Sequence, residues 1–373
     1  MQIFRLFFIR LFATIALYLF MGRGTADGQI LPDNSSMELI KTGINHIYNL
    51  EFSDAKDVLT AINTKYPSHP ATYLYMGMLI YYQNYPLLPS SPISRNFEAQ
   101  LRTSIRLCEA KEGWLDDPET LLIDLCARGM LLLFYSENEM SGEVFPIAAT
   151  TWKCIRKSFQ FTSVYPDFSY FTGLYNYYRE AYPENHPIYK PLAVLFPPGE
   201  KKKGLAELQY AAENSIILRA ESYSILSWIC IHYENDFHKA LDYSKTLYDQ
   251  YQSNLLFKGE YLKSLFLLNA YDEAEKMILS SGDSKNEYFL GQLAIFNGLL
   301  QEMKYHNYQL AGKYYEEGIN DMKNFGSRGA SYIQYGKASL KRINDLQDEK
   351  LSDRKKKNKN SDNINLGLLS LDD

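Results

Sequence analysis

The nearest approach to a metal-ligand pattern in this chain is a run of four potential donors, His232, Glu234, Asp236 and His238. A zinc site needs its donors to converge on one point, at about 2.0 to 2.2 Å from the metal. These four residues lie where one helix is expected to end and the next to begin, and such a segment aligns its donors only by chance. We therefore expect no metal site.

Other catalytic arrangements are equally sparse. The six histidines are scattered along the chain, and no nucleophile stands beside a base. No glycine-rich phosphate loop follows a strand, since Gly22 and Gly24 fall in an apolar N-terminal leader. An active site would require carboxylates and histidines distant in sequence to meet. The sequence thus predicts a protein that is not an enzyme and that holds no cofactor.

Three successive lysines, Lys201, Lys202 and Lys203, follow a Pro-Gly-Glu turn at the start of an expected helix. Positive charge in a first turn opposes the helix dipole, and a bound anion or an acidic partner would relieve that conflict. The three lysines are therefore candidate contacts for such a ligand. The alternative is that they are simply solvated, because exposed charge at a helix terminus costs only about 0.3 to 1 kcal/mol.

The elements that must position these residues are short helices in a repeat. An aromatic residue followed three positions later by alanine occurs at 52–55, 237–240 and 271–274, and the last two copies are 34 residues apart. In the first copy Gly43, Ala55 and Pro67 are spaced by 12 residues, and Gly77 follows Gly43 by 34. The small residues allow two helices to approach closely, and Pro67 cannot continue a helix.

This pattern resembles the tetratricopeptide repeat, in which a small residue, an aromatic–alanine pair and a proline recur. The resemblance covers 36–83 and 220–281. Trp228 and Leu262 replace the small residue in the later units, and Gln252 replaces the closing proline. Because strand-like Val/Ile/Thr alternation is also lacking, we expect an all-α fold: a right-handed α-solenoid of about seven tetratricopeptide-like antiparallel helix pairs plus a C-terminal capping helix, over 29–346.

The expected pairs have boundaries set by apolar periodicity and by helix-breaking residues. They span 36–65, 69–112, 117–163, 167–214, 218–251, 254–281 and 284–324, with the cap at 327–346. Proline-rich insertions are expected at 84–95 and 182–199, and a smaller extension at 136–142. Insertions in solenoids form loops, often on a binding face.

The resemblance also implies a concave groove lined by the first helix of each pair. Five positions beyond the small-residue site of successive first helices the sequence has an aromatic ring, and in the tetratricopeptide family this offset belongs to the concave face. Such rings offer large contact area at low entropic cost. The candidate groove residues are Tyr48, Tyr82, Phe134, Tyr178 and Tyr233. The alternative is that these rings pack between adjacent repeats.

The N-terminus is typical of a secretory signal. Arg5 and Arg10 precede an apolar run, and small residues follow at Gly24, Ala26 and Gly28. Cleavage after Ala26 and cleavage after Gly28 both satisfy the small-residue rule. We expect residues 1–28 to be a cleavable signal peptide and the mature chain to be periplasmic or extracellular, without a stable membrane span; the alternative is a retained anchor.

The C-terminal segment 347–373 differs in composition. It carries a basic run and ends in four leucines and two aspartates, which predicts a disordered charged tail; a short docking motif is the alternative. The full chain has a formal charge of −5, and removal of 1–28 would leave −7, so a nucleic-acid partner is not expected.

Four cysteines, Cys108, Cys126, Cys154 and Cys230, fall on apolar helical faces. An exported protein permits disulfides, but in the hairpin expected from helices 97–112 and 117–136 Cys108 would face about residue 121 rather than Cys126, so we expect buried free thiols.

The leading functional hypothesis is a non-catalytic exported scaffold that binds a protein or peptide partner in its concave groove. The alternative is a periplasmic or surface component that binds a solute or glycan through a tyrosine-rich groove.

Overall fold

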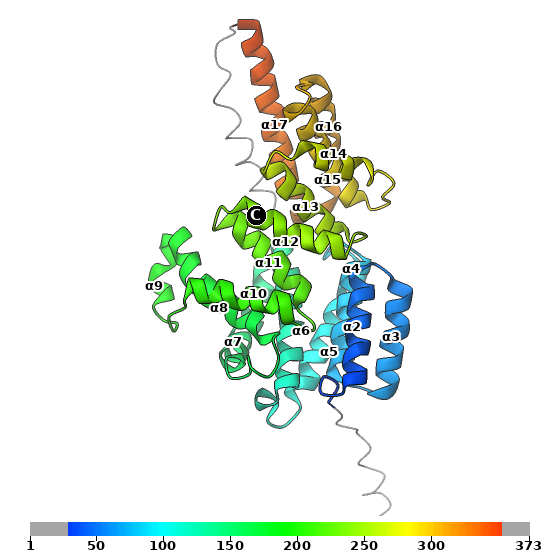
Figure 1. The fold of residues 1–373 in the computed structure, drawn as a ribbon, viewed down its shortest axis with the longest axis vertical. Coiled ribbons are helices and arrows are strands. Elements are labelled where there is room, and N and C mark those ends of the chain that lie inside the picture. The colour runs from blue at the N-terminus through cyan, green and yellow to red at the C-terminus, as the bar shows by residue number, and fades with distance from the viewer. Residues whose placement is uncertain (1–28, 353–373) are drawn as a thin grey trace, which may run out of the picture.

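The computed structural model describes residues 29–352, whose regular secondary structure is entirely helical (Figure 1). The signal peptide predicted at 1–28 and the tail from 353 to 373 lie outside the described residues. None of the described helices combines the length and the apolar composition needed to cross a bilayer. The helices are α2 (Asn34–Tyr48), α3 (Phe52–Lys65), α4 (Pro70–Gln83), α5 (Pro92–Glu109), α6 (Pro118–Glu137), α7 (Ser141–Ser158), α8 (Phe168–Asn185), α9 (Lys190–Ala193), α10 (Lys201–Asn214), α11 (Arg219–His232), α12 (Phe237–Gln250), α13 (Leu255–Leu267), α14 (Tyr271–Leu279), α15 (Glu287–Met303), α16 (Tyr308–Met322) and α17 (Ser327–Ser352).

Apart from the one-turn helix α9, the described residues form fifteen helices that pack mostly against their sequence neighbours. They make seven antiparallel pairs, α2–α3, α4–α5, α6–α7, α8–α10, α11–α12, α13–α14 and α15–α16, followed by α17. The predicted all-α class and serial helix pairing are confirmed. Helix α17 continues to Ser352, six residues beyond the predicted end of the cap.

The turn inside a pair has the same backbone geometry in five of the seven pairs. In each, a residue with positive φ lies two positions before the second helix, and these residues are Leu50, Glu139, Asn235, Asn269 and His306, with φ between 52° and 61°. The left-handed region is uncommon for residues other than glycine, although asparagine and histidine adopt it more readily than most. Its recurrence at the same position, at Leu50 and Glu139 as well as at Asn235, Asn269 and His306, indicates that close antiparallel pairing favours this turn.

The two remaining pairs, α4–α5 and α8–α10, have longer connections, 84–91 and 186–200, which overlap the predicted insertions 84–95 and 182–199. The predicted bounds were too wide on the helical side, because the first residues of α5 and the last residues of α8 are helical. The extension predicted at 136–142 is wrong. Helices α6 and α7 are joined by the ordinary turn at Glu139, because Ser136 and Glu137 still belong to α6.

Small residues stand where helices cross closely. A β-carbon added to Gly77 would lie 2.5 Å from Leu101 Cδ2 of the paired helix, and one added to Gly204 would lie 2.5 Å from the backbone nitrogen of Tyr177. The alanines of the aromatic–alanine motif, at 55, 240 and 274, are completely buried. Only a minimal side chain fits at these contacts, as the repeat pattern indicates.

The array does not stay open: its two halves meet along a line that we call the seam. Here the C-terminal ends of α2, α4 and α6 contact the N-terminal ends of α13, α15 and α17. The side-chain amide of Asn254 donates to the carbonyl of Tyr48 at 3.0 Å, and that of Asn286 donates to the carbonyl of Tyr85 at 2.6 Å. In Figure 1 the yellow to red helices accordingly lie beyond the upper ends of the blue and cyan helices.

The third seam contact is ionic. Arg328, at the start of α17, forms an ion pair with Glu137 at 2.6 Å and lies over the rings of Tyr85 and Tyr288, at 5.7 and 6.0 Å from their centroids. Each seam contact joins residues about 200 positions apart in sequence, so the first and last thirds of the chain form one body.

Candidate interaction surface

The most exposed apolar side chains lie on the connection between α8 and α10. We call residues 182–199 the excursion; they comprise the last turn of α8 and most of the connection, which contains a 3-10 turn (Pro187–Tyr189) and helix α9. Pro183 lies within α8, and the other four prolines of the excursion lie beyond it, where they remove backbone donors, fix φ and prevent a long continuous helix. In Figure 1 α9 projects sideways from the stack.

The base of the excursion is fixed against α8. Tyr175 donates its hydroxyl to the carbonyl of Pro197 at 2.5 Å, and Arg179 donates to the carbonyl of Phe196 at 3.1 Å. A β-carbon on Gly199 would lie 2.6 Å from the carbonyl oxygen of Asn176, so only glycine permits this approach. The ring of Phe196 meets Trp152 of α7 edge-on, with centroids 5.3 Å apart.

The outer part of the excursion presents apolar side chains to solvent. Ile188, Val194 and Leu195 are 84 %, 80 % and 76 % exposed. On α7, Phe145 is 78 % exposed and lies two helical turns before Trp152, on the same face of that helix. Val194 and Leu195 are consecutive and Ile188 lies on the same connection, and exposed apolar residues gathered in one segment are typical of surfaces that contact another molecule.

The structure explains the three lysines at 201–203 without a ligand. The backbone N–H of Lys201 donates to Glu180 Oε2 at 2.9 Å, and the Lys201 ammonium lies 3.0 Å from Glu234. Partial burial alone would raise the pKa of Glu234, but hydrogen bonds from Tyr177 and Lys201 hold that pKa below its usual value. The conflict with the helix dipole is thus relieved by carboxylates of the chain itself.

The other two lysines differ. Lys203 lies 3.7 Å from Glu207, one turn along α10, whereas Lys202 is exposed beside the excursion. A bound anion is therefore not needed at this helix start. Of the three lysines predicted to contact an anion or an acidic partner, Lys202 remains the candidate.

Of the five candidate groove rings, two are buried. Tyr48 is 1 % and Phe134 0 % exposed. The ring of Tyr48 contacts Tyr82, Tyr251 and Phe257 at centroid distances of 5.1 to 5.8 Å, and Phe134 contacts Phe97 at 5.1 Å. This agrees with the packing interpretation: Tyr48 is covered by Tyr251, which follows α12, and by Phe257 of α13, whereas Phe134 packs against the neighbouring helix α5.

The other three rings are partly buried. Tyr178 and Tyr233 contact each other at 5.4 Å, between α8 and the end of α11. Tyr82 lines a small cavity of about 110 Å³ at the seam, together with Tyr85 and Asn286. The five rings therefore fall into two groups: Tyr48, Tyr82 and Phe134 belong to or pack against one apolar core, and Tyr178 and Tyr233 pack against another.

A larger cavity of about 280 Å³ lies between α2 and the α10–α11 connection. Its polar lining includes Lys41, Asn45, Arg219, Gln250 and Tyr251. The connection is held by the buried carboxylate of Asp167, which accepts the backbone N–H groups of residues 216, 217 and 218 at 2.7 to 3.0 Å. Such a cavity is large enough for a small polar molecule.

The candidate metal donors near residue 235 serve structural roles. Asp236 caps α12 by accepting the backbone N–H of Lys239 at 3.1 Å, and His232 stacks on Trp228 with centroids 4.5 Å apart. Within 29–352 the donors that do converge are His46, Glu51 and Asp54, of which the two carboxylates are exposed. They form a surface cluster with no further feature that would retain an ion.

Sequence reasoning singled out the excursion but not its exposed residues. An indication was present in the sequence, since Ile188, Val194 and Leu195 are apolar residues in a proline-rich stretch that was expected to leave the stack. The seam contacts of Asn254 and Asn286 could not be predicted in this way, because an asparagine before a helix is expected simply as a helix cap.

A comparison with protein-family models found no matching family, and a comparison with curated proteins found no similar sequence. The geometry therefore defines the class of protein by itself: an all-helical protein of sequential antiparallel helix pairs.

Proposed function

We propose that this protein is a non-catalytic exported scaffold that binds a protein partner through the excursion and the adjacent face of α7. The observation that carries the proposal is the exposure of Ile188, Val194 and Leu195 on a connection whose base is fixed by hydrogen bonds. An anchored apolar surface reduces the entropic cost of association. The partner it suits offers an apolar groove and a carboxylate for Lys202.

We further propose that the helix pairs are repeats of the tetratricopeptide type, wound into a right-handed solenoid. The 34-residue spacing and the identical turn in five pairs support this assignment. The proposed partner site differs from the groove that the resemblance implies, because two of the candidate groove rings, Tyr48 and Phe134, are buried within the chain.

Photo-crosslinking in cells tests the proposal. A photoreactive residue at 188, 194 or 195 should capture the same protein, and one at Leu279 should not, although Leu279 is 76 % exposed like Leu195. The purified partner should then bind the triple variant I188S/V194S/L195S at least tenfold more weakly than it binds L279S, because three desolvated apolar side chains are lost. Equal affinities would refute the proposal.

A second candidate function is the binding of a small polar solute, favoured by the 280 Å³ cavity with Lys41 and Arg219 on its wall. A thermal-shift screen against sugars and small organic acids tests it. A saturable rise in melting temperature that is lost in Arg219→Ala supports solute binding, and a flat response across the screen opposes it.

A further inference from the structure

The first described residues are docked into the helical body. Ile30 and Leu31 are 0 % and 3 % exposed and belong to the same apolar core as α2–α6. Gln29 is exposed, and its side-chain amide donates to Asp117 Oδ2 at 3.1 Å. This segment directly follows the predicted signal peptide, so its contacts bear on where the mature chain begins.

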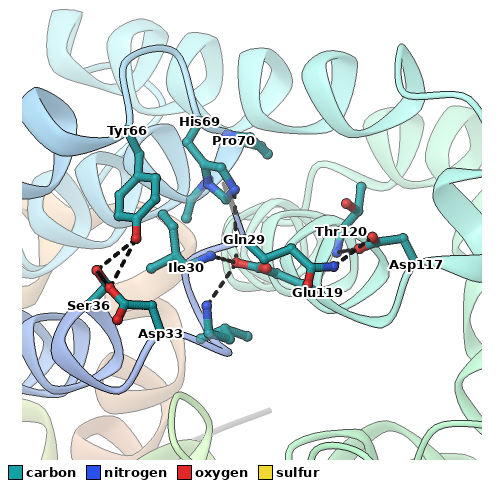
Figure 2. Close-up of polar contacts among 12 residues, drawn as sticks. Gln29, Ile30, Asp33, Ser36, Tyr66, His69, Pro70, Asp117, Glu119 and Thr120 are labelled. Carbon is teal, nitrogen blue, oxygen red and sulfur yellow. Dashed lines mark hydrogen bonds and ion pairs between the residues drawn. The ribbon is translucent and has the colours of Figure 1, made fainter. Parts of the chain in front are cut away.

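One buried carboxylate receives the segment. Glu119, in the first turn of α6, is 2 % exposed, and its Oε1 accepts the backbone N–H groups of Ile30 at 2.8 Å and Leu31 at 3.1 Å (Figure 2). His69 Nε2 lies 3.9 Å from the same oxygen. The other oxygen, Oε2, is buried and has no hydrogen-bond partner among residues 29–352.

A buried carboxylate oxygen without a partner is costly, and a cation close by would offset that cost. Burial raises the pKa of Glu119, although the two backbone N–H groups act in the opposite direction. Two groups of the chain that can carry positive charge already face Glu119: His69, whose Nε2 lies 3.9 Å from Oε1, and Lys111, whose charge lowers the Glu119 pKa. Neither donates to Oε2, and an α-ammonium at Gln29 would add a third cation, since its nitrogen is one residue before the Ile30 nitrogen that already lies 2.8 Å from Glu119.

We propose that the signal peptide is cut between Gly28 and Gln29 and that the new α-ammonium of Gln29 pairs with the Glu119 carboxylate. Hydrolysis breaks the Gly28–Gln29 C–N bond; water supplies the hydroxyl of the new Gly28 carboxyl and a proton for the Gln29 amine, which is protonated at neutral pH. Cleavage after Ala26 would leave two further residues before Gln29 and would move the α-ammonium away from the backbone that contacts Glu119. The inference rests on export of the chain and is independent of the partner site.

The cleavage point is tested by exporting the full chain and determining the mature N-terminus by mass spectrometry. A chain that begins at Gln29 is expected. A mature chain that begins at Asp27, or one that retains residues 1–28, would overturn the proposal.

The ion pair is tested on purified chains of residues 29–373 with a free or an acetylated Gln29 amine. At pH 7 the free amine should melt about 2 °C or more above the acetylated form. Mass measurement confirms that the glutamine has not cyclised, since cyclisation would remove the amine.

The difference between the two forms should vanish in Glu119→Gln and persist in Asp117→Asn, which keeps the cap of α6 while removing the neighbouring charge. It should also vanish near pH 10, because the ion pair is present below the α-ammonium pKa and is lost as the pH rises through it. Equal melting of the two forms at pH 7, or a difference that survives in Glu119→Gln, would refute the pairing.

Discussion

Asn254 donates its side-chain amide to the backbone carbonyl of Tyr48 across 206 residues of sequence, while its side-chain oxygen accepts the N–H groups of Leu256 and Phe257. One buried side chain therefore caps α13 and also holds the end of α2. Stacked repeats usually contact only their neighbours, so this bond marks a departure from the open solenoid.

Asn254→Ala should destabilise the protein by about 2 to 4 kcal/mol, because it removes a helix cap and also leaves the buried Tyr48 carbonyl without its amide donor. Hydrogen exchange should rise both at the end of α2 and at the start of α13. The control is Asn307→Ala, which removes the exposed cap of α16 away from the seam and should cost only about 1 kcal/mol. Faster exchange confined to α13 in Asn254→Ala would contradict the seam.

Glu221 should make stability depend on pH. Burial raises its pKa to about 7, against a smaller opposite effect of the hydrogen bond that the Tyr48 hydroxyl donates to it. Asp167 raises the pKa further, and no cation is among the causes of the shift. The folded state thus binds a proton more strongly than the unfolded state, and this contribution to stability is lost as the pH rises from about 4.5 to 7.

In Glu221→Gln the pH-dependent contribution should disappear. The free energy of unfolding of the variant minus that of the wild type should therefore be larger at pH 8 than at pH 5, by up to about 3 kcal/mol. Urea unfolding of both proteins at the two pH values measures this difference. Glu213→Gln, which changes an exposed carboxyl at the end of α10, serves as the control. Parallel pH profiles for the wild type and Glu221→Gln would contradict the prediction.

Gly204→Ala should lower the urea midpoint, because the added methyl group would lie 2.5 Å from the backbone of Tyr177 and would push α8 and α10 apart. The matched control is Gly129→Ala on α6, where nothing lies within 4 Å of the added atom. That change should stabilise the helix by roughly 0.5 to 1 kcal/mol. A midpoint for Gly204→Ala at or above that of the wild type would show that the two helices are not in close contact.

The four cysteines should behave as inaccessible free thiols. All four are buried and unpaired, as the sequence indicated, and burial raises the pKa of Cys230 to about 11. An aromatic disulfide reagent at pH 8 should label none of them in the folded protein and all four after denaturation without reductant. Fewer than four thiols in the denatured protein would reveal a disulfide.

Much of the fold could be predicted from the sequence, because each helix pair of a repeat array is determined by residues that lie close together in the sequence. The spacing of Gly43, Ala55 and Pro67 sets the helix ends and the close crossing of one pair, and prolines mark the two long connections. The same reasoning failed at residues 136–142, where polar residues suggested an insertion although they complete α6 and its ordinary turn.

The candidate site was less predictable, because closure is a long-range property. The equal offsets of Tyr48 and Phe134 predicted a shared exposed face, but they could not show that Tyr48 would be covered by Tyr251 and Phe257, about 200 residues further along the chain. The ion pairs of Lys201 with Glu234 and of Arg328 with Glu137 likewise join residues whose proximity depends on the whole array.

The seam also changes what a break in the backbone would do. Because its bonds join α2, α4 and α6 to α13, α15 and α17, a chain divided within the excursion would still have its two parts held together. Co-expressed fragments ending at 189 and starting at 190 are therefore suited to reconstitution by complementation, a behaviour that a linear array linked only through neighbouring repeats would support far less well.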